Sequence, residues 1–323
     1  MQKKTLLSLV VAGASIVVVA CSSISATQAC ADLSTAVCNK LNSCAPTLVV
    51  EAYGDVGTCA TRSALSCNSA LALKDTSDTP DLAENCSKQY ATMSCNDAFD
   101  NDLPAACKPT QAGTVANGGV CGSAGQCSSN VCQIDPTTGC GTCIAPVAAG
   151  GACKGSTDCN AGLVCSSAVC VAPAAQGQAC TTAAPITPCQ AGLVCDGSMC
   201  QVPLAAGSAC TPSKSLCDGS QGYWCTPVGT RCQPILFATT GQPCGYDSKT
   251  GDLTVCTASA SCANVDSKTL MGTCAAPAAD GAACSSTSDC TPPAICLGAT
   301  TSDAGADAGT PGVCTVRDPS TCH

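Results

Sequence analysis

Large apolar side chains are scarce in this sequence. Trp, Tyr and Phe together make up 2% of its 323 residues, and much of its 46% apolar fraction is Ala and Cys. Such a chain cannot build a sizeable aromatic or Leu-rich core. Hydrophobic burial alone is therefore not expected to hold it together.

Basic residues are also few, and there is one histidine. Lys and Arg number 13 against 22 Asp and Glu, for a formal net charge of −9, and the basic residues are scattered singly. Nucleic-acid binding needs a clustered basic face, so nucleic acid is excluded as a partner. The single histidine is His323 at the C-terminal end, which argues against a Ser-His-Asp or Cys-His catalytic pair. We therefore expect no enzymatic activity.

Cysteine is the residue that the chain has in excess. Its 35 cysteines, about 11% of all residues, exceed the level that marks a disulfide scaffold. Setting Cys21 aside leaves 34, the even number that a fully paired framework requires. The composition therefore predicts a small disulfide-rich fold.

The first residues have the pattern of a bacterial export signal. Lys3 and Lys4 precede an apolar run over 6–20, which has the length of a signal peptide's hydrophobic region and is shorter than a bilayer span. The string Val-Val-Ala-Cys that ends at Cys21 resembles the bacterial lipobox. This resemblance implies that Cys21 is lipidated and becomes the first mature residue, and that its acyl chains attach the protein to a membrane.

We accordingly predict a lipoprotein signal peptide over 1–20 and a lipidated tether over 21–29. The predicted location is the bacterial outer membrane or the cell surface, with the lipid on Cys21 as the contact with the membrane. Export to an oxidising compartment favours disulfides over metal-binding thiolates, so we predict no metal and no cofactor.

Residues 30–107 are predicted to form a helical domain with eight cysteines. One helix is expected around Cys30 and Cys44, which recur at helical spacing, and a second over 56–73. A third is expected from Thr79, which offers a hydroxyl N-cap before proline. Four bridges could join these helices. The cysteines are Cys30, Cys38, Cys44, Cys59, Cys67, Cys86, Cys95 and Cys107.

After Cys107 the chain repeats, because a glycine three residues before a cysteine opens each of six units. Short intervals rich in Gly, Ser, Thr and Asn favour turns and brief β-hairpins within each unit. Cys140 and Cys322 are left over at four cysteines per unit, and the sequence does not decide their pairing. The predicted modules are 108–146, 147–173, 174–203, 204–235, 236–277 and 278–323, the last with a low-complexity loop over 302–312.

The cysteine spacing of the second module, Cys-x5-Cys-x2-Gly-x2-Cys-x4-Cys, resembles the repeat named after the Dickkopf N-terminal region. The layout of lipobox, helical head and tandem repeats is similar to a family of uncharacterised bacterial cysteine-rich lipoproteins. Longer intervals in modules five and six leave a shared disulfide pairing open there. The candidate disulfide cysteines of modules two and three are Cys153, Cys159, Cys165, Cys170, Cys180, Cys189, Cys195 and Cys200.

Three features carry possible chemistry. Cys140 and Cys143 have the spacing of a thiol-disulfide redox pair, but no βαβ pattern surrounds them and a structural role is favoured. The 302–312 loop holds acidic residues without the dense spacing of a calcium loop. Tyr223-Trp224 is either an exposed contact surface or the cap of a small core.

The sequence thus predicts a disulfide-stapled helical domain followed by a tandem array of short cysteine-rich modules with turns and minor β-hairpins. The predicted function is a non-enzymatic, lipid-anchored surface protein whose modules form a rod for binding or adhesion to an unknown protein or glycan. A secreted disulfide-rich protease inhibitor is the alternative. A thiol-disulfide oxidoreductase using Cys140 and Cys143 is a weaker one.

Overall fold

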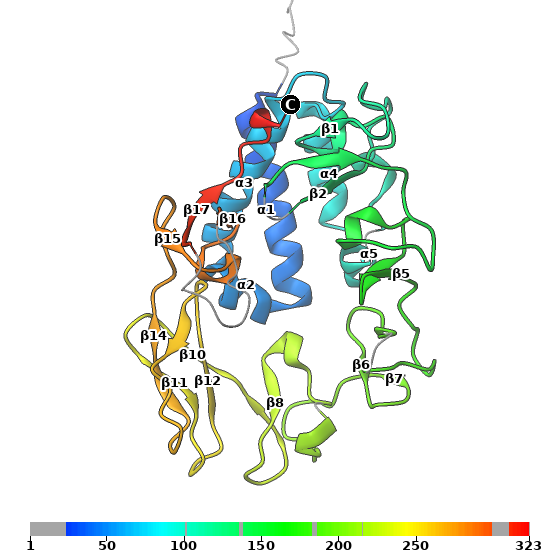
Figure 1. Ribbon diagram of the computed structural model, residues 1–323. Coiled ribbons are helices and arrows are strands. Elements are labelled where there is room, and N and C mark those ends of the chain that lie inside the picture. Colours follow the sequence, from blue (N-terminus) through cyan, green and yellow to red (C-terminus); the bar gives the residue numbers. More distant parts are fainter. Residues whose placement is uncertain are drawn as a thin grey trace, which may run out of the picture.

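The computed structural model describes residues 24–100, 102–135, 138–182, 186–214, 216–298 and 310–322. The predicted signal peptide, the lipidation site Cys21, the start of the tether, most of the 302–312 loop and His323 lie outside these residues. Within them, the predicted fold class is confirmed: a helical head is followed by small disulfide-stapled antiparallel β modules (Figure 1).

The head contains the three predicted helices and two short ones. Serine, aspartate and threonine side chains cap α1, α3 and α4 by accepting a hydrogen bond from a first-turn amide, and Thr79 is one of these caps. α2 and α5 were not expected, because their few residues are too short for a periodic pattern. The bounds are α1 (Ala26–Cys44), α2 (Pro46–Tyr53), α3 (Val56–Leu71), α4 (Pro80–Tyr90), α5 (Cys95–Phe99) and a 3-10 turn η1 (Ala105–Cys107).

The eight head cysteines pair among themselves. Two disulfides join α1 to α3, and a third joins the end of α1 to α5. A fourth joins α4 to η1. The helices α1, α3 and α4 are therefore each covalently linked to a neighbouring element. The pairs are Cys30–Cys67, Cys38–Cys59, Cys44–Cys95 and Cys86–Cys107.

All six modules share one disulfide pattern, in which the first cysteine pairs with the third and the second with the fourth. The third and fourth cysteines lie directly opposite each other on the two strands of a hairpin. Each is bonded to a cysteine that precedes the hairpin in the chain and lies in a loop or in a short strand. The long intervals in modules five and six leave the pairing unchanged, because they lengthen loops between the bonded positions. Their pairs are Cys244–Cys262, Cys256–Cys274, Cys284–Cys296 and Cys290–Cys314.

The strands are short, and each module forms its own small sheet. Module 5 has the largest, with the order β10-β12-β11-β14-β13. The bounds are β1 (Val120–Cys121), β2 (Cys132–Ile134), β3 (Gly141–Cys143), β4 (Val164–Ser166), β5 (Val169–Val171), β6 (Val194–Cys195), β7 (Cys200–Gln201), β8 (Tyr223–Cys225), β9 (Cys232–Pro234), β10 (Leu236–Ala238), β11 (Pro243–Tyr246), β12 (Leu253–Cys256), β13 (Ser261–Ala263), β14 (Met271–Ala275), β15 (Ala283–Cys284), β16 (Ala294–Leu297) and β17 (Gly312–Val316).

The interior of each unit is made largely of sulfur. In module 1, for example, the buried cluster consists of four cysteines with Val115 and Ile134 packed against it. In the head, Cys38, Val49 and Cys59 form the corresponding cluster. Apart from cysteine, the buried apolar residues in the described part of the chain are five alanines, two valines and Met93. The disulfides therefore take the place of the missing large side chains.

The modules form a closed ring and not the rod expected from tandem repetition. In Figure 1 the array leaves the head at β1, runs down one side, crosses at β8, and returns past β14 and β15 so that the C-terminal end lies near β1. The disulfide Cys140–Cys322 joins modules 1 and 6 across 182 residues and closes the ring covalently. The expected rod shape was wrong, because the repeated cysteine spacing predicts the fold of each module but not how the array of modules bends back onto the head.

Modules 4 and 5 dock on the end of the head formed by α2. In module 4, the Gln221 side chain donates to the carbonyl of Cys44 at 3.0 Å, and Ser220 accepts from a threonine hydroxyl of α2. In module 5, the backbone amides of Ala258 and Ser259 donate to the last carbonyls of α2. Ala258 and Ser259 have φ angles of 57° and 60°, which is unfavourable for residues with a side chain, and the helix capping offsets this cost.

Candidate functional site

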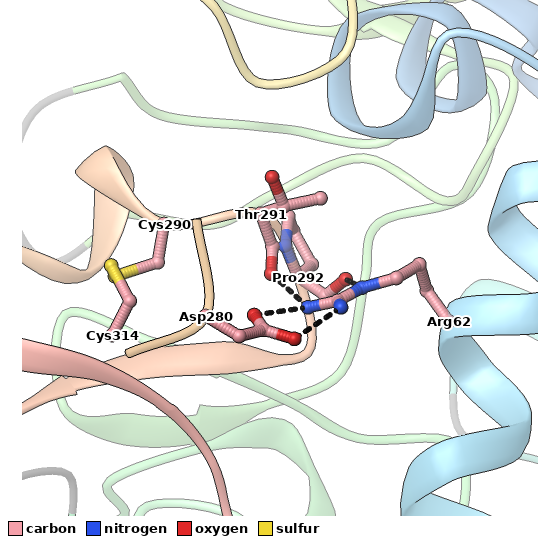
Figure 2. Close-up of polar contacts among 6 residues, drawn as sticks. All are labelled: Arg62, Asp280, Cys290, Thr291, Pro292 and Cys314. Carbon is pink, nitrogen blue, oxygen red and sulfur yellow. Dashed lines mark hydrogen bonds and ion pairs between the residues drawn. A yellow bond between two sulfur atoms is a disulfide. The ribbon is translucent and has the colours of Figure 1, made fainter. Parts of the chain in front are cut away.

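A dense set of polar contacts joins the head to module 6 through Arg62 of α3 (Figure 2). The guanidinium donates to both carboxylate oxygens of Asp280, at 2.6 and 2.9 Å. It also donates to the backbone carbonyls of Thr291 at 2.8 Å and Pro292 at 2.9 Å. The planar fork of arginine suits this bidentate arrangement, which an ammonium group could not reproduce.

The environment of this contact strengthens it. The Arg62 side chain is only 18% exposed, and that of Asp280 is 43% exposed. The hydrogen bonds to Arg62 lower the pKa of Asp280, and the same bonds raise the pKa of Arg62. The two carbonyls follow Cys290, whose bridge to Cys314 holds this segment in place. Arg62 was not found from the sequence, because a lone arginine on a helix gives no pattern.

Module 6 is also attached to module 1. Besides the disulfide Cys140–Cys322, the Arg317 guanidinium donates to the backbone carbonyl of Gly122. Burial lowers the pKa of Arg317. Module 6 is therefore held on two sides, by the head through Arg62 and by module 1 through these contacts.

Cys140 and Cys143 do not form the disulfide that a Cys-x-x-Cys redox site requires. Cys140 is bonded to Cys322 and Cys143 to Cys127, so the two cysteines belong to different bridges. A thiol-disulfide active site requires the two cysteines of the motif to pair with each other. The oxidoreductase interpretation loses the geometry on which it depended.

The candidate cysteines of modules 2 and 3 lie in bridges of the common pattern. Sulfurs of neighbouring bridges approach within 4.8 Å, as for Cys153, Cys159 and Cys170. Each of them is oxidised in a disulfide, so these groups offer no thiolate to a metal. The pairs are Cys153–Cys165, Cys159–Cys170, Cys180–Cys195 and Cys189–Cys200.

A polar side chain directly before the second cysteine organises the first turn of several modules. In module 6, the Asp289 carboxylate accepts from the backbone amides of Ser285 at 2.8 Å and Ser286 at 2.9 Å. Asp158 of module 2 accepts from the backbone amides of its own turn in the same way. The aspartate of the Ser/Thr-Asp-Cys string in these two modules thus stabilises the turn by accepting hydrogen bonds from its backbone amides.

The Asp289 contact leads to a pH-dependent prediction. Hydrogen bonds from the backbone and hydroxyl of Ser285, and then from Ser286, lower the pKa of Asp289 from 3.8 to about 2. Because the folded pKa is lowered, this stabilisation is complete above pH 3.8 and is lost as the pH falls toward 2. Carboxyl NMR titration should place Asp289 near pH 2, with exchange of the Ser285 and Ser286 amides rising below that point. An Asp289→Asn variant should lack this pH dependence, and titration near the usual aspartate value would contradict the assignment.

Tyr223 and Trp224 lie at the junction of modules 4 and 5. Both side chains are half-buried in β8. The Trp224 ring packs edge-on against Tyr246 of module 5, with centroids 5.5 Å apart and planes at 80°. The indole nitrogen is buried and has no hydrogen-bond partner among the described residues. Trp224 therefore links modules 4 and 5. The use of Tyr223 and Trp224 as a contact surface stays a prediction.

Two open grooves are present on the head. One of about 430 Å³ lies along α1 and includes Asp32 and Lys40. The other, of about 510 Å³, lies between the head and module 1, where hydroxyls, amides and the carboxylates of Asp75 and Asp81 line it. Their linings contain no cysteine or histidine, so neither groove offers a thiol or imidazole nucleophile.

No family model, no curated protein and no solved structure matches this chain. The Dickkopf-like resemblance therefore stays a prediction. Of the helices described, none has both the length and the hydropathy to cross a bilayer. All cysteines from Cys30 to Cys322 are paired, and this density of disulfides indicates an extracellular or otherwise oxidising location.

Proposed function

We propose that the protein is a non-enzymatic, lipid-anchored binding protein of the cell surface, with a protein or glycan as partner. The observation that carries the proposal is the covalently closed ring of modules docked on the helical head. Such a ring holds many surface loops in fixed relative positions. A binding surface that is rigid before contact loses little conformational entropy on association.

The proposed anchor gives the molecule an orientation. Cys21 precedes the N-cap of α1, Ser25, by four residues, a reach of roughly 14 Å when extended. A lipid on Cys21 would place the N-terminal end of α1 beside the membrane. In Figure 1 this end of α1 lies opposite the hairpins of modules 4 and 5, which would then face away from the anchoring membrane.

Lipidation is tested on the full chain expressed in a bacterial host. Metabolic labelling with a palmitate analogue should mark the wild-type protein and leave a Cys21→Ser variant unlabelled. Membrane fractionation should move the variant to the soluble fraction, because the acyl chains supply the attachment. Labelling that persists in Cys21→Ser would place the lipid on another residue, and an unlabelled wild-type protein would show that no lipid is attached.

Binding is tested with fluorescently labelled residues 22–323 on cells of the producing species and of its neighbours. Saturable binding that protease treatment removes would indicate a protein partner, and loss after glycosidase treatment a glycan. A Tyr223→Ala/Trp224→Ala variant tests the aromatic pair, and Val202→Asn is the control because Val202 is 59% exposed on module 3. Absence of saturable binding to every cell type would refute the proposal.

A further inference from the structure

Cys140–Cys322 differs from the other disulfides of the described residues because it joins two modules. Every other bridge lies within the head or within a single module. Its sequence separation of 182 residues exceeds the next largest, which is 51 residues for Cys44–Cys95. Breaking it therefore opens the covalent ring without removing a bridge that any unit has for its own fold.

This disulfide is also accessible, which most of the others are not. Among the bridges that the structure describes, only Cys140–Cys322 and Cys44–Cys95 have neither cysteine buried. In each remaining bridge at least one cysteine is buried in the interior of its unit. The accessible bridges are thus one that closes the ring and one that lies within the head.

Accessibility of both cysteines decides whether an external thiol can reduce a disulfide. The attacking thiolate must reach one sulfur, and the other sulfur must leave as a thiolate. If one sulfur is buried, either the attack on it is blocked or a thiolate has to form in an apolar interior, which raises the thiol pKa and makes it a poor leaving group. The ring-closing disulfide meets both requirements, and the buried bridges of the modules do not.

Reduction of this disulfide leaves modules 1 and 6 docked. Arg317 still donates to the carbonyl of Gly122, and the two backbones are in close contact, because a Cβ on Gly122 would collide with Pro319. Arg62 still holds module 6 on the head. The two new thiols therefore stay near each other, and every other cysteine between residues 30 and 322 is already paired. Reoxidation can thus restore the same disulfide.

We propose that Cys140–Cys322 is a site of reversible thiol–disulfide exchange, through which an exported dithiol switches the ring between a covalently closed and a non-covalently closed state. A thiolate of the dithiol attacks one Sγ, and the other Sγ leaves as a thiolate and is protonated. The second thiolate of the dithiol then attacks the mixed disulfide and releases the second cysteine, which is protonated in turn. The dithiol loses two electrons and two protons and becomes a disulfide, and the two cysteines gain them.

The exchange changes the rigidity of the proposed binding surface. With the disulfide intact, the ring cannot open without breaking a covalent bond. With it reduced, closure depends on the contacts of Arg62 and Arg317, which break and re-form in solution, so more conformational entropy is lost on association. The inference rests on the proposed function only for this consequence, because the exchange itself needs neither a partner nor a lipid.

The exchange is tested on unlipidated residues 22–323 with reduced thioredoxin and, separately, with dithiothreitol as the dithiol. Free thiols are blocked with N-ethylmaleimide at each concentration and located by peptide mass mapping. Cys140 and Cys322 should be labelled at a dithiol concentration roughly tenfold below that needed for Cys159 and Cys170, which are bonded to each other and both buried in module 2. Labelling of all four cysteines at one concentration, or of Cys159 and Cys170 first, overturns the proposal.

Opening is tested in an Arg62→Met/Arg317→Met variant, which lacks both guanidinium contacts of module 6. Small-angle X-ray scattering should show a compact oxidised protein and a larger radius of gyration once Cys140 and Cys322 are reduced. Oxidised glutathione should restore the compact value. The wild type is the control, and it should stay compact when the same two cysteines are reduced, because Arg62 and Arg317 remain.

Three outcomes of the opening test overturn the proposal. They are a variant that stays compact after complete labelling of Cys140 and Cys322, opening that oxidised glutathione does not reverse, and loss of the far-UV circular dichroism signal in step with the labelling. Replacing Cys44 and Cys95 by serine in the same variant should leave the opening unchanged, and loss of the opening would assign it to the head. Since no partner or anchor takes part, these results are independent of the tests of binding and lipidation.

Discussion

Reduction of the native protein with excess phosphine, without denaturant, is expected to unfold the head and the modules together. The far-UV circular dichroism signal of α1, α3 and α4 should be lost, and the protein should elute from a sizing column as an expanded chain. The buried apolar set explains this result, because it consists of cysteines with a few alanines, two valines and Met93 in the described residues.

The magnitude of the effect follows from the disulfides. Each bridge contributes about 2–4 kcal/mol by restricting the unfolded chain, whereas a whole domain is usually stable by only about 5–15 kcal/mol. At about 0.05–0.15 kcal/mol per residue, a module of roughly 30 residues is stable by about 1.5–4.5 kcal/mol, so loss of its two bridges, together about 4–8 kcal/mol, is enough to unfold it. The same treatment of a cysteine-free helical protein serves as the control for the reductant.

Survival of the helical signal after complete thiol titration would contradict this expectation. It would show that the small apolar cluster of the head, in which Leu41, Tyr53 and Val56 surround Val49, holds the helices without their bridges. Thiol counting is needed alongside the spectra, because buried disulfides that escape reduction would give the same signal.

Releasing module 6 from both of its attachments is expected to open the ring. The variant combines Cys140→Ser, Cys322→Ser and Arg317→Met, which remove the disulfide and the guanidinium contact with module 1, with Arg62→Met, which removes the guanidinium contacts with the head. Loss of the disulfide Cys140–Cys322 costs about 2–4 kcal/mol, because the unfolded chain regains the conformational entropy that the closed loop had removed. Loss of Arg62 costs about 2 kcal/mol, because two carbonyls and a carboxylate lose charge-assisted hydrogen bonds while Asp280 is partly hydrated.

Small-angle X-ray scattering should report an increased radius of gyration for the combined variant, and limited proteolysis should cut the linker near Pro277. Either set of substitutions alone should leave the ring closed, since the other attachment remains. Lys88→Met is the matched control, because Lys88 is 64% exposed in a surface pair with Glu84 and holds no module. An open ring in a single variant, or a compact combined variant, would contradict this account of ring closure.

Much of the local structure could be predicted from spacing along the chain. The N-cap at Thr79, the helical recurrence of Cys30 and Cys44, and the hairpin-forming intervals of the modules act over a few residues, and each appears in the structure. The similar Ser/Thr-Asp-Cys strings that end at Cys159 and Cys290 also correspond to one turn with one hydrogen-bonding role.

Features that depend on distant residues could not be predicted in the same way. Arg62 and Asp280 are 218 residues apart, and Gly122 meets Arg317 across 195 residues. No periodicity relates such positions.

The sequence by itself determined that this is a disulfide framework with a helical head and repeated hairpin modules, because cysteine spacing, caps and turn residues act locally. The tertiary structure alone decided how Cys140 and Cys322 pair and that the array closes into a ring. The physical reason is that loop closure over 182 residues depends on where the modules dock on the head. That docking is made by contacts such as those of Arg62, whose partners only the folded chain brings together.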